Sequence, residues 1–196
     1  MADITTRERI IAEADRLIYE NGYEHTSFAD IADAVGISRG NFYYHFKSKD
    51  EILDAVIGKR MMSTEQMLNA WAAQSSHPAE RIRSFILMVV TNQAKIMRHG
   101  CPVGTLCSEL AKLGHAALPQ SNQLFSLFRT WLHQQFVLLG READADALAM
   151  HALAFSQGVA VLAHAFNDEQ FVAREVERRC AWLDGIVADA AQVPAI

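Results

Sequence analysis

The chain has 196 residues, enough for one domain or for a small domain joined to a larger one. Hydrophobic residues make up 51% of it and only 4 prolines interrupt them, which argues against an intrinsically disordered chain. The formal net charge of −5 argues against a broadly basic nucleic-acid binder, so any contact with a polyanion must come from a local patch.

The cysteine content and the N-terminal composition favour a reducing cytosol. An odd number of cysteines suggests no disulfide framework, and the charged N-terminal stretch has no apolar core of the secretory type. The most apolar window, residues 147–166, is about long enough to cross a bilayer, but polar side chains lie all around its helical wheel. We therefore expect a cytoplasmic protein with no membrane partner, and a buried helix at this window.

Capping signals predict two helices at the start of the chain. Thr5 and Glu8 have the spacing of a capping box, apolar residues at helical spacing follow, and residues 21–22 supply a stop. Ser27 and Asp30 form a second such box ahead of a short amphipathic helix.

Two further helices follow closely. Gly36 ends the second helix, and Ser38 is the expected N-cap of a very short third helix that runs to about Phe46. Ser48 with Glu51 opens a long fourth helix. Two short helices separated by a three-residue turn are the layout of a helix-turn-helix.

The remaining sequence also predicts helices, because no stretch alternates with period two for long enough to form a strand. The predicted fold class is therefore all-α, with about nine helices. After the fourth helix, we expect helices at about residues 79–98, 102–114, 120–140, 144–166 and 171–191.

The third helix lies in a segment of unusual composition, ISRGNFYYHFKSK at residues 37–49. This segment carries two lysines, an arginine and a histidine, and it has no acidic residue. On a helical wheel, Phe42 and Phe46 define the buried side. The opposite side is centred on Gly40 and Tyr44, so we expect that side to face a polyanion.

Each exposed side chain of this helix has a chemical use against DNA. Arg39 suits a bidentate contact to a guanine edge, and Asn41 suits one to an adenine edge. Gly40 has no side chain, so the backbone can approach the groove closely. Tyr43 and Tyr44 offer flat rings to thymine methyls or sugars, and hydroxyls to phosphates.

Other side chains suit the phosphates of the DNA backbone. Lys47 and Lys49 are expected to hold the flanking backbone, which sets register without reading sequence. Thr26 and Ser27, at the start of the second helix, add hydroxyl and backbone donors. The alternative is a helical adaptor that uses the two tyrosines to bind protein and does not bind DNA.

The run TSFADIADAVGISRGNFYYHFKSKDEIL resembles the N-terminal signature of the TetR (tetracycline repressor-like) family of transcriptional regulators. The resemblance covers roughly residues 5–57, and its core, G-x-S-x-G-x-F-Y-x-H-F-x-S-K, is a strong motif. It implies a DNA-reading third helix at Ser38–His45 and a phosphate-binding lysine at Lys49. The contacts that it implies come from Arg39, Gly40, Asn41, Tyr43, Tyr44 and His45.

The resemblance also implies a second, larger helical domain that binds a small molecule and dimerises. We expect a helix-turn-helix DNA-binding domain at residues 1–50 and a ligand-binding and dimerisation domain at residues 51–196, joined by a helix that starts at about residue 48. The expected partners are double-stranded operator DNA, a small-molecule effector and a second copy of the chain. The predicted function is a ligand-responsive, sequence-specific DNA-binding regulator, a repressor that the effector releases from its operator.

No catalytic residue, metal ion or cofactor is expected. The histidines show no HExxH or other metal-ligand spacing, and no Gly-rich phosphate loop occurs. We therefore do not expect an enzyme.

The two C-terminal helices are the expected dimer interface, because so apolar a terminal pair needs cover. Two such helices per protomer make a four-helix bundle between subunits, which the resemblance also implies. The alternative is that the same residues form a core within one subunit. The candidate interface residues are Ala152, Phe155, Val159, Ala163, Trp182, Leu183 and Ile186.

The effector pocket is expected among the helices between residues 79 and 140, with a contribution from the next helix. These helices combine Met, Phe and Leu with isolated polar groups, as small-ligand sites do, although each side chain can equally be plain core. The candidate pocket residues are Phe85, Met88, Asn92, Leu106, Cys107, Leu110, Phe125, Phe128 and Phe155.

The cysteines suggest an alternative function, a repressor that senses oxidants or electrophiles. Cys101 lies at a helix start, where the helix dipole favours a thiolate. Cys107 falls on a different face of the ideal helix, so a disulfide between the two requires unwinding. The competing interpretation is that Cys107 and Cys180 are small core residues and that Cys101 only fits a tight turn.

Overall fold

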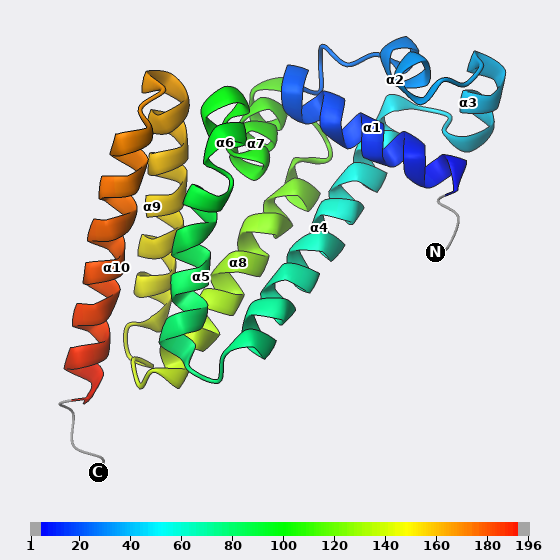
Figure 1. The fold of residues 1–196 in the computed structure, drawn as a ribbon. Helices are drawn as coiled ribbons and strands as arrows, with labels where there is room; N and C mark the ends of the chain where they lie inside the picture. Colours follow the sequence, from blue (N-terminus) through cyan, green and yellow to red (C-terminus); the bar gives the residue numbers. More distant parts are fainter. Residues whose placement is uncertain (1–4, 192–196) are drawn as a thin grey trace. The chain divides into compact units, whose positions relative to one another are not determined.

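The computed structural model describes residues 5–191, and these residues form ten α-helices and no strand (Figure 1). The all-α prediction is confirmed. The helices are α1 (Thr6–Asn21), α2 (Phe28–Val35), α3 (Arg39–His45), α4 (Lys49–Gln74), α5 (Pro78–Thr91), α6 (Gln93–His99), α7 (Pro102–Leu113), α8 (Leu118–Leu138), α9 (Ala145–Phe166) and α10 (Glu169–Ala191).

The predicted capping boxes form at the first two helices. The Thr5 backbone N–H donates to Glu8 Oε2 at 2.8 Å, and the Glu8 N–H donates to Thr5 Oγ1 at 3.2 Å. Ser27 and Asp30 repeat this arrangement at the start of α2. Each box satisfies amide groups that a helix start leaves without partners, which is why this local signal located both starts.

Several helix boundaries differ slightly from the prediction, and one predicted helix is divided. The helix expected at residues 79–98 is divided at Asn92, whose Nδ2 donates to the Met88 carbonyl oxygen at 2.9 Å. Such a side-chain bond competes with the helical backbone bonds. Helix α8 begins at Leu118 and includes Pro119, because a proline in the first turn loses no backbone hydrogen bond.

The chain divides into two compact units. Residues 5–64 together with Pro102–Leu124 form the first unit, and Glu65–Cys101 together with residues 125–191 form the second. Helices α4 and α8 each contribute to both units. The predicted boundary lies after residue 50, whereas by packing the first unit also includes residues 51–64 and 102–124.

The core of the first unit forms where α1, α2 and α3 pack on the first turns of α4 and on α7. Its largest buried side chains include Phe42 of α3, Phe46 just after α3, and Ile31 of α2. Leu106 and Leu110 extend the same core from α7. A helix as short as α3 has little stability of its own, so this packing determines its position.

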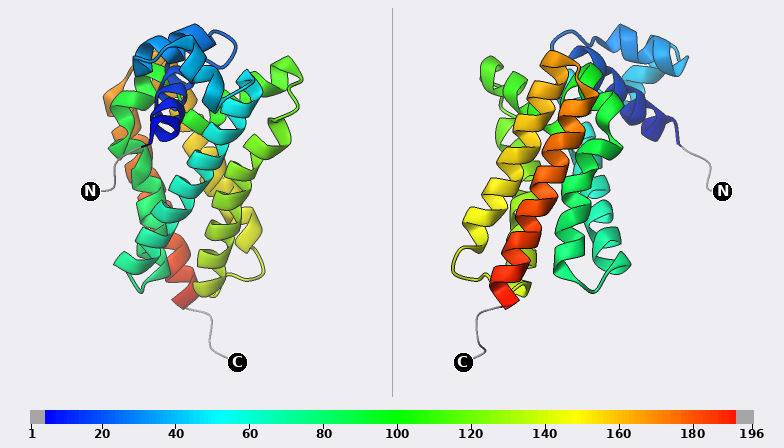
Figure 2. Two further views of the ribbon diagram at one scale, coloured as in Figure 1. Left: turned by 90° about the vertical axis from the view of Figure 1, so that its right-hand side faces the viewer. Right: turned by 60° about the vertical axis from the view of Figure 1, so that its left-hand side comes forward.

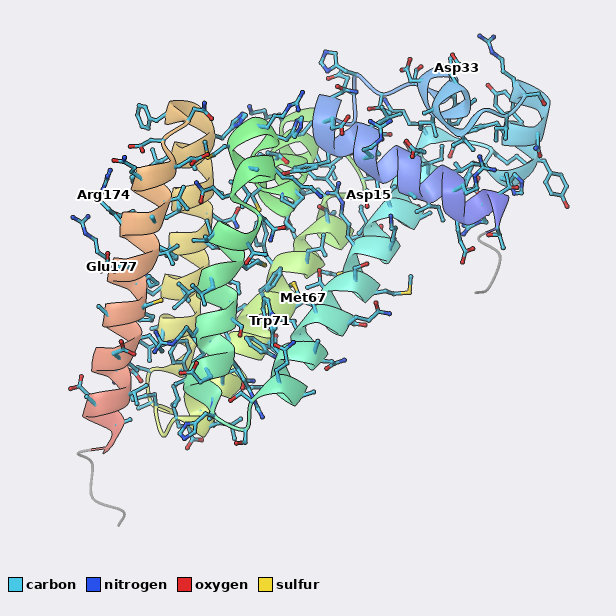
Figure 3. All side chains as sticks on the ribbon, viewed as in Figure 1. Asp15, Asp33, Met67, Trp71, Arg174 and Glu177 are labelled. Carbon is cyan, nitrogen blue, oxygen red and sulfur yellow. The ribbon has the colours of Figure 1, made fainter. Side chains whose placement is uncertain are left out.

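The second unit is a helical bundle in which α5 lies beside α9 and α10 (Figure 2). The rings of Phe85 in α5 and Phe128 in α8 have centroids 5.6 Å apart. Met67 and Trp71 project from the later turns of α4 (Figure 3), and the Trp71 ring lies 5.8 Å from that of Trp131 in α8. Burial of these apolar faces supplies most of the stability of the bundle.

Helix α9 is the one described helix that is long and apolar enough to cross a membrane, judged by length and composition. One face of it, which includes Ala152 and Val159, is buried in the core of the second unit. The helix that the sequence predicted to be buried at residues 147–166 is therefore buried on that face.

Candidate nucleic-acid interface

Helices α2 and α3 are joined by a tight turn at residues 36–38. Gly36 adopts the left-handed conformation, with φ of 73° and ψ of 39°, and its N–H donates to the Ala32 carbonyl oxygen at 3.0 Å. Ser38 caps α3, because its Oγ accepts a hydrogen bond from the Asn41 N–H at 3.3 Å. A glycine C-cap and a serine N-cap separated by one residue fix the angle between the two helices.

The predicted division of α3 into two faces is confirmed. Phe42 is 1% exposed and Phe46 is fully buried, whereas Tyr44 is 78% exposed. Tyr43 is also exposed, and its ring rests edge-on against Phe28 with centroids 5.5 Å apart. The buried rings hold α3 in the core of the first unit, and both tyrosines remain exposed.

The first turn of α3 presents only solvent-facing groups. Arg39, Gly40 and Asn41 are all exposed. A Cβ added at Gly40 would meet no atom of the described residues within 4 Å, so nothing inside the protein requires glycine there. The predicted close approach of DNA to the backbone at Gly40 stays a prediction.

A hollow of about 180 Å³ lies between the start of α2 and the exposed face of α3. Ser27 at the N-cap of α2 and Arg39 at the start of α3 line it, together with Tyr43. The Ser27 hydroxyl donates to Asp30 Oδ2 at 2.6 Å, and this bond lowers the pKa of Asp30.

The two lysines after α3 are held in different ways. Lys47 donates from Nζ to the Tyr43 carbonyl oxygen, and its backbone N–H donates to Glu51 Oε2 at 2.7 Å. Lys49 donates from Nζ to the Glu24 carbonyl oxygen at 3.0 Å and lies over the Tyr23 ring, 4.3 Å from its centroid. Burial lowers the pKa of Lys49. Both side chains leave ammonium donors for a further partner.

Thr26 is placed differently from the prediction. Its side chain is buried, and its hydroxyl donates to the Gly22 carbonyl oxygen at 2.7 Å. The hydroxyl therefore stabilises the loop before α2, and this placement favours a role in that loop over the predicted contact to phosphate.

Comparison with known proteins agrees with this geometry. The sequence model described as "Bacterial regulatory proteins, tetR family" matches residues 10–56. An uncharacterized HTH-type transcriptional regulator in the lacX 3'region of Lactococcus lactis is 31% identical over 151 residues, which are 76% of this chain and 77% of that protein. The chain belongs to the TetR family. It is a DNA-binding transcriptional regulator of the helix-turn-helix type.

Further relatives extend the similarity over most of this TetR-family protein. The HTH-type transcriptional regulator TtgR of Pseudomonas putida is 25% identical over 79% of this chain and 78% of its own length. A crystal structure of a TetR transcriptional regulator from Legionella pneumophila has a TM-score of 0.81 and 28% identity, and covers 94% of this chain and 98% of that one. These relatives carry the names of transcriptional regulators and not of enzymes or adaptors.

Sequence reasoning missed a polar group inside the first unit of the TetR-family protein. The Tyr23 hydroxyl donates to Asp50 Oδ1 at 2.7 Å, and His115 Nε2 lies 3.2 Å from the same hydroxyl. Burial is the main cause that raises the pKa of Tyr23, and the hydrogen bond from Tyr23 lowers the pKa of Asp50. The residues come from three distant stretches of sequence, so no local signal was present to find them.

The predicted pocket residues do not form one cluster. Leu106, Cys107 and Leu110 are buried in the first unit, where Cys107 Sγ lies 3.0 Å from Ser121 Oγ. Asn92 is exposed. The rest belong to the core of the second unit or pack against it: Phe85, Met88, Phe125, Phe128 and Phe155.

A different set of residues lines a hollow of about 330 Å³ in the second unit, between α4 and α8. Its lining combines apolar and polar side chains, and none of them was predicted. They are Glu65, Leu68, Asn69, Leu127, Thr130, Trp131 and Gln134.

The predicted dimer residues lie mostly inside one subunit. Of the seven, Ala152, Phe155, Val159, Ala163 and Leu183 are buried in the core of the second unit, and Trp182 and Ile186 are half-buried. For the buried five, the alternative of an intramolecular core fits the structure. The large apolar side chains that α9 exposes were not predicted: Met150, Val161, Leu162 and Phe166.

The cysteines form no disulfide among the described residues. Cys101 is half-buried in the second unit, where Gln157 Nε2 lies 3.5 Å from its Sγ. Cys107 is buried in the first unit, so the two residues of the predicted redox pair belong to different packing environments.

Proposed function

We propose that this TetR-family protein is a cytoplasmic repressor that binds operator DNA as a homodimer and leaves it when a small-molecule effector binds. We propose no catalytic activity. The observation that carries the proposal is the division of α3, which buries Phe42 while the side chains of Arg39, Asn41 and Tyr44 face solvent. A helix with such exposed groups suits the edges of bases in a major groove.

The homodimer is proposed because one α3 reads only a few base pairs, and helix-turn-helix proteins therefore act in pairs on two half-sites. The exposed apolar side chains of α9, from Met150 to Phe166, form the proposed contact surface. Large apolar side chains grouped on one helix are costly to leave in water, so they need cover.

The effector is proposed to bind in the second unit. The hollow between α4 and α8 combines Trp131 and Leu68 with polar side chains, and its size is close to the lower limit of about 300 Å³ for small-ligand pockets. Phe85, Phe128 and Phe155 stay candidates in the neighbouring core of this unit.

The proposed switch uses the helices shared by both units. Helix α4 runs without a break from Lys49 in the first unit to Gln74 in the second. An effector that shifts α4 changes the separation of the two α3 helices, and half-sites lie at fixed spacings of about 34–36 Å. The effector must bind the released form more tightly than the DNA-bound form, because equal affinity shifts nothing.

The test starts with selection of binding sites from random duplex DNA, followed by fluorescence anisotropy titration. An inverted repeat supports the proposal, and binding without sequence preference contradicts it. Arg39→Ala and Tyr44→Ala are each expected to weaken binding to the selected duplex about tenfold or more. Lys112→Ala, which removes an exposed cation of α7, is the matched control and should stay within about twofold.

A further inference from the structure

A carboxylate from α7 holds the loop between α1 and α2. Glu109 Oε2 accepts a hydrogen bond from the Tyr23 backbone N–H, and Oε1 accepts one from the Glu24 N–H, both at 2.9 Å. The two oxygens thus bind two consecutive amides. Charge-assisted bonds of this kind are about twice as strong as neutral ones.

Gly22, the residue before these two amides, also lies close to the Glu109 carboxylate. Gly22 has a φ of 90°, which side-chain-bearing residues rarely adopt. A Cβ on Gly22 would lie 3.0 Å from Glu109 Oε1 and 3.2 Å from Oε2. Gly22 therefore permits both the turn of the backbone and the approach of Glu109.

The loop in turn holds Lys49, the lysine that the sequence predicts to bind a DNA phosphate and that we take as such here. The Glu24 carbonyl oxygen accepts from Lys49 Nζ at 3.0 Å, and the Tyr23 ring lies under the same ammonium group. The backbone of Glu24 therefore donates from its N–H to Glu109 and accepts at its carbonyl oxygen from Lys49. A displacement of this loop displaces the ammonium group.

We propose that Glu109 is a positioning residue for DNA binding, which fixes the loop at residues 22–24 and through it the phosphate contact of Lys49. The inference rests on the proposed function, because it takes Lys49 as a phosphate contact. It adds a residue of α7 to the DNA-binding machinery, from a segment where sequence reasoning placed part of the effector pocket and a possible redox cysteine.

Two considerations predict opposite effects of removing Glu109 on DNA affinity. DNA is a dense polyanion, so loss of a carboxylate from the DNA-binding unit should strengthen binding. Loss of a positioning contact should weaken it. The sign of the change therefore separates the two roles.

The experiment measures the Kd of the full-length protein for its selected duplex by anisotropy. Glu109→Gln keeps the size of the side chain but offers an NH2 group to one of the two amides, so we expect binding about tenfold weaker. Asp33→Asn is the matched control, since Asp33 is an exposed carboxylate on the outer side of α2 (Figure 3). It should leave binding unchanged or slightly tighter. Unchanged or tighter binding by Glu109→Gln overturns the inference.

A double-mutant cycle tests whether Glu109 acts through Lys49. In a Lys49→Ala background, Glu109→Gln should cost less than about threefold, because the contact that it positions is already gone. In a Lys47→Ala background, the full effect of about tenfold should remain. Equal effects in the two backgrounds would mean a general effect on folding and would overturn the inference.

Two further measurements cover the remaining outcomes. Hydrogen exchange in the wild-type protein should protect the Tyr23 and Glu24 amides, and exchange at the rate of an unstructured chain overturns the inference even if Glu109→Gln fails to fold. Lys49→Ala alone separates this inference from the proposed function. If Lys49→Ala binds DNA as tightly as wild type, Lys49 does not contact a phosphate, and the inference is overturned as well. If Lys49→Ala weakens DNA binding but Glu109→Gln does not, the inference is overturned and the proposed function is unaffected.

Discussion

Phe42 and Tyr44 are two residues apart on α3 and lie in opposite environments. The Phe42 ring lies 5.1 Å from that of Phe28 inside the first unit, whereas most of Tyr44 is exposed to solvent. A step of two residues turns a helix by about 200°, so inward packing of Phe42 determines the direction in which Tyr44 projects. Packing in the core and the proposed DNA contact thus involve different residues of one short helix.

The group of Tyr23, Asp50 and His115 links stability of the first unit to pH. The hydrogen bond from Tyr23 lowers the pKa of Asp50 in the folded protein. A carboxyl group whose pKa is lower in the folded than in the unfolded state, about 3.9 for Asp, adds stability above that pH. The added stability is lost as the pH falls through the folded-state pKa.

Tyr23→Phe should therefore destabilise the protein at pH 7 and do so less in acid. The Asp50 side chain is 69% exposed, so the part that depends on pH is about 1 kcal/mol or less. Urea unfolding of wild type and variant, at neutral pH and well below pH 4, measures the difference. In an Asp50→Asn background the effect of Tyr23→Phe should not vary with pH. If the destabilisation caused by Tyr23→Phe is the same at neutral and acid pH when Asp50 is present, the prediction is contradicted.

At the scale of whole elements, the starts of α2 and α3 and the two faces of α3 could be predicted because their signals are local. The caps at Ser27 and Ser38, the glycine at position 36 and the two phenylalanines of the buried side all lie within one short stretch of sequence. Each signal reports a backbone or packing requirement of the residue itself. The predicted helix starts and the predicted faces of α3 are accordingly those of the structure.

Helix α7 could be predicted as a helix but not as part of the first unit. Its expected range of residues 102–114 is close to the observed Pro102–Leu113. Its packing partners are far away in sequence, as in the contact between Glu109 and Tyr23 across 86 residues. Local periodicity identifies an apolar face but not the helix that covers it, so Leu106 and Leu110 were assigned to a pocket.

Helix α9 shows the same limit for the dimer surface. Its sequence is apolar on most sides, so periodicity alone does not separate the face in the core from the face in solvent. Helices α5, α6 and α10 pack on α9, and this packing determines which of its faces is buried, as at Ala152 and Ala163. Val161 and Phe166 remain exposed as a consequence.

Val161→Arg should therefore break the proposed homodimer without unfolding the subunit. Val161 is 64% exposed, and a charge on a surface buried between two copies is costly. Light scattering should give the mass of one chain, 21.8 kDa, where wild type gives twice that mass. Leu138→Arg is the matched control, since Leu138 is 62% exposed at the end of α8. A dimeric Val161→Arg protein, or a monomeric Leu138→Arg protein, would contradict the assignment of the surface to α9.

At the scale of the whole molecule, the two units share the backbone of α4 and α8. A ligand that favours one arrangement of these helices in the second unit changes the free energy of that arrangement for the entire chain. By linkage, the factor by which an effector weakens DNA binding equals the factor by which DNA weakens effector binding.

The net charge of the whole molecule affects the strength of its long-range attraction to DNA. The net charge is −5, yet residues 37–49 contain no acidic side chain. Long-range attraction to DNA is therefore weak, and affinity depends on the cations that touch phosphates. In this segment Lys47 and Lys49 are the cations proposed to touch phosphates, while Arg39 is proposed to contact a base.

A shallow dependence of DNA affinity on salt should follow. Two lysines per protomer neutralise about four phosphates per dimer, which gives a slope of log K against log salt of about −4. Lys49→Ala should reduce the slope by about two per dimer, one for each protomer, while Lys112→Ala leaves it unchanged. Anisotropy titrations on the selected duplex between about 50 and 200 mM salt measure it. A wild-type slope steeper than about −8 would mean that many more cations of this acidic protein reach the phosphates, and would contradict the assignment of the contact to one short segment.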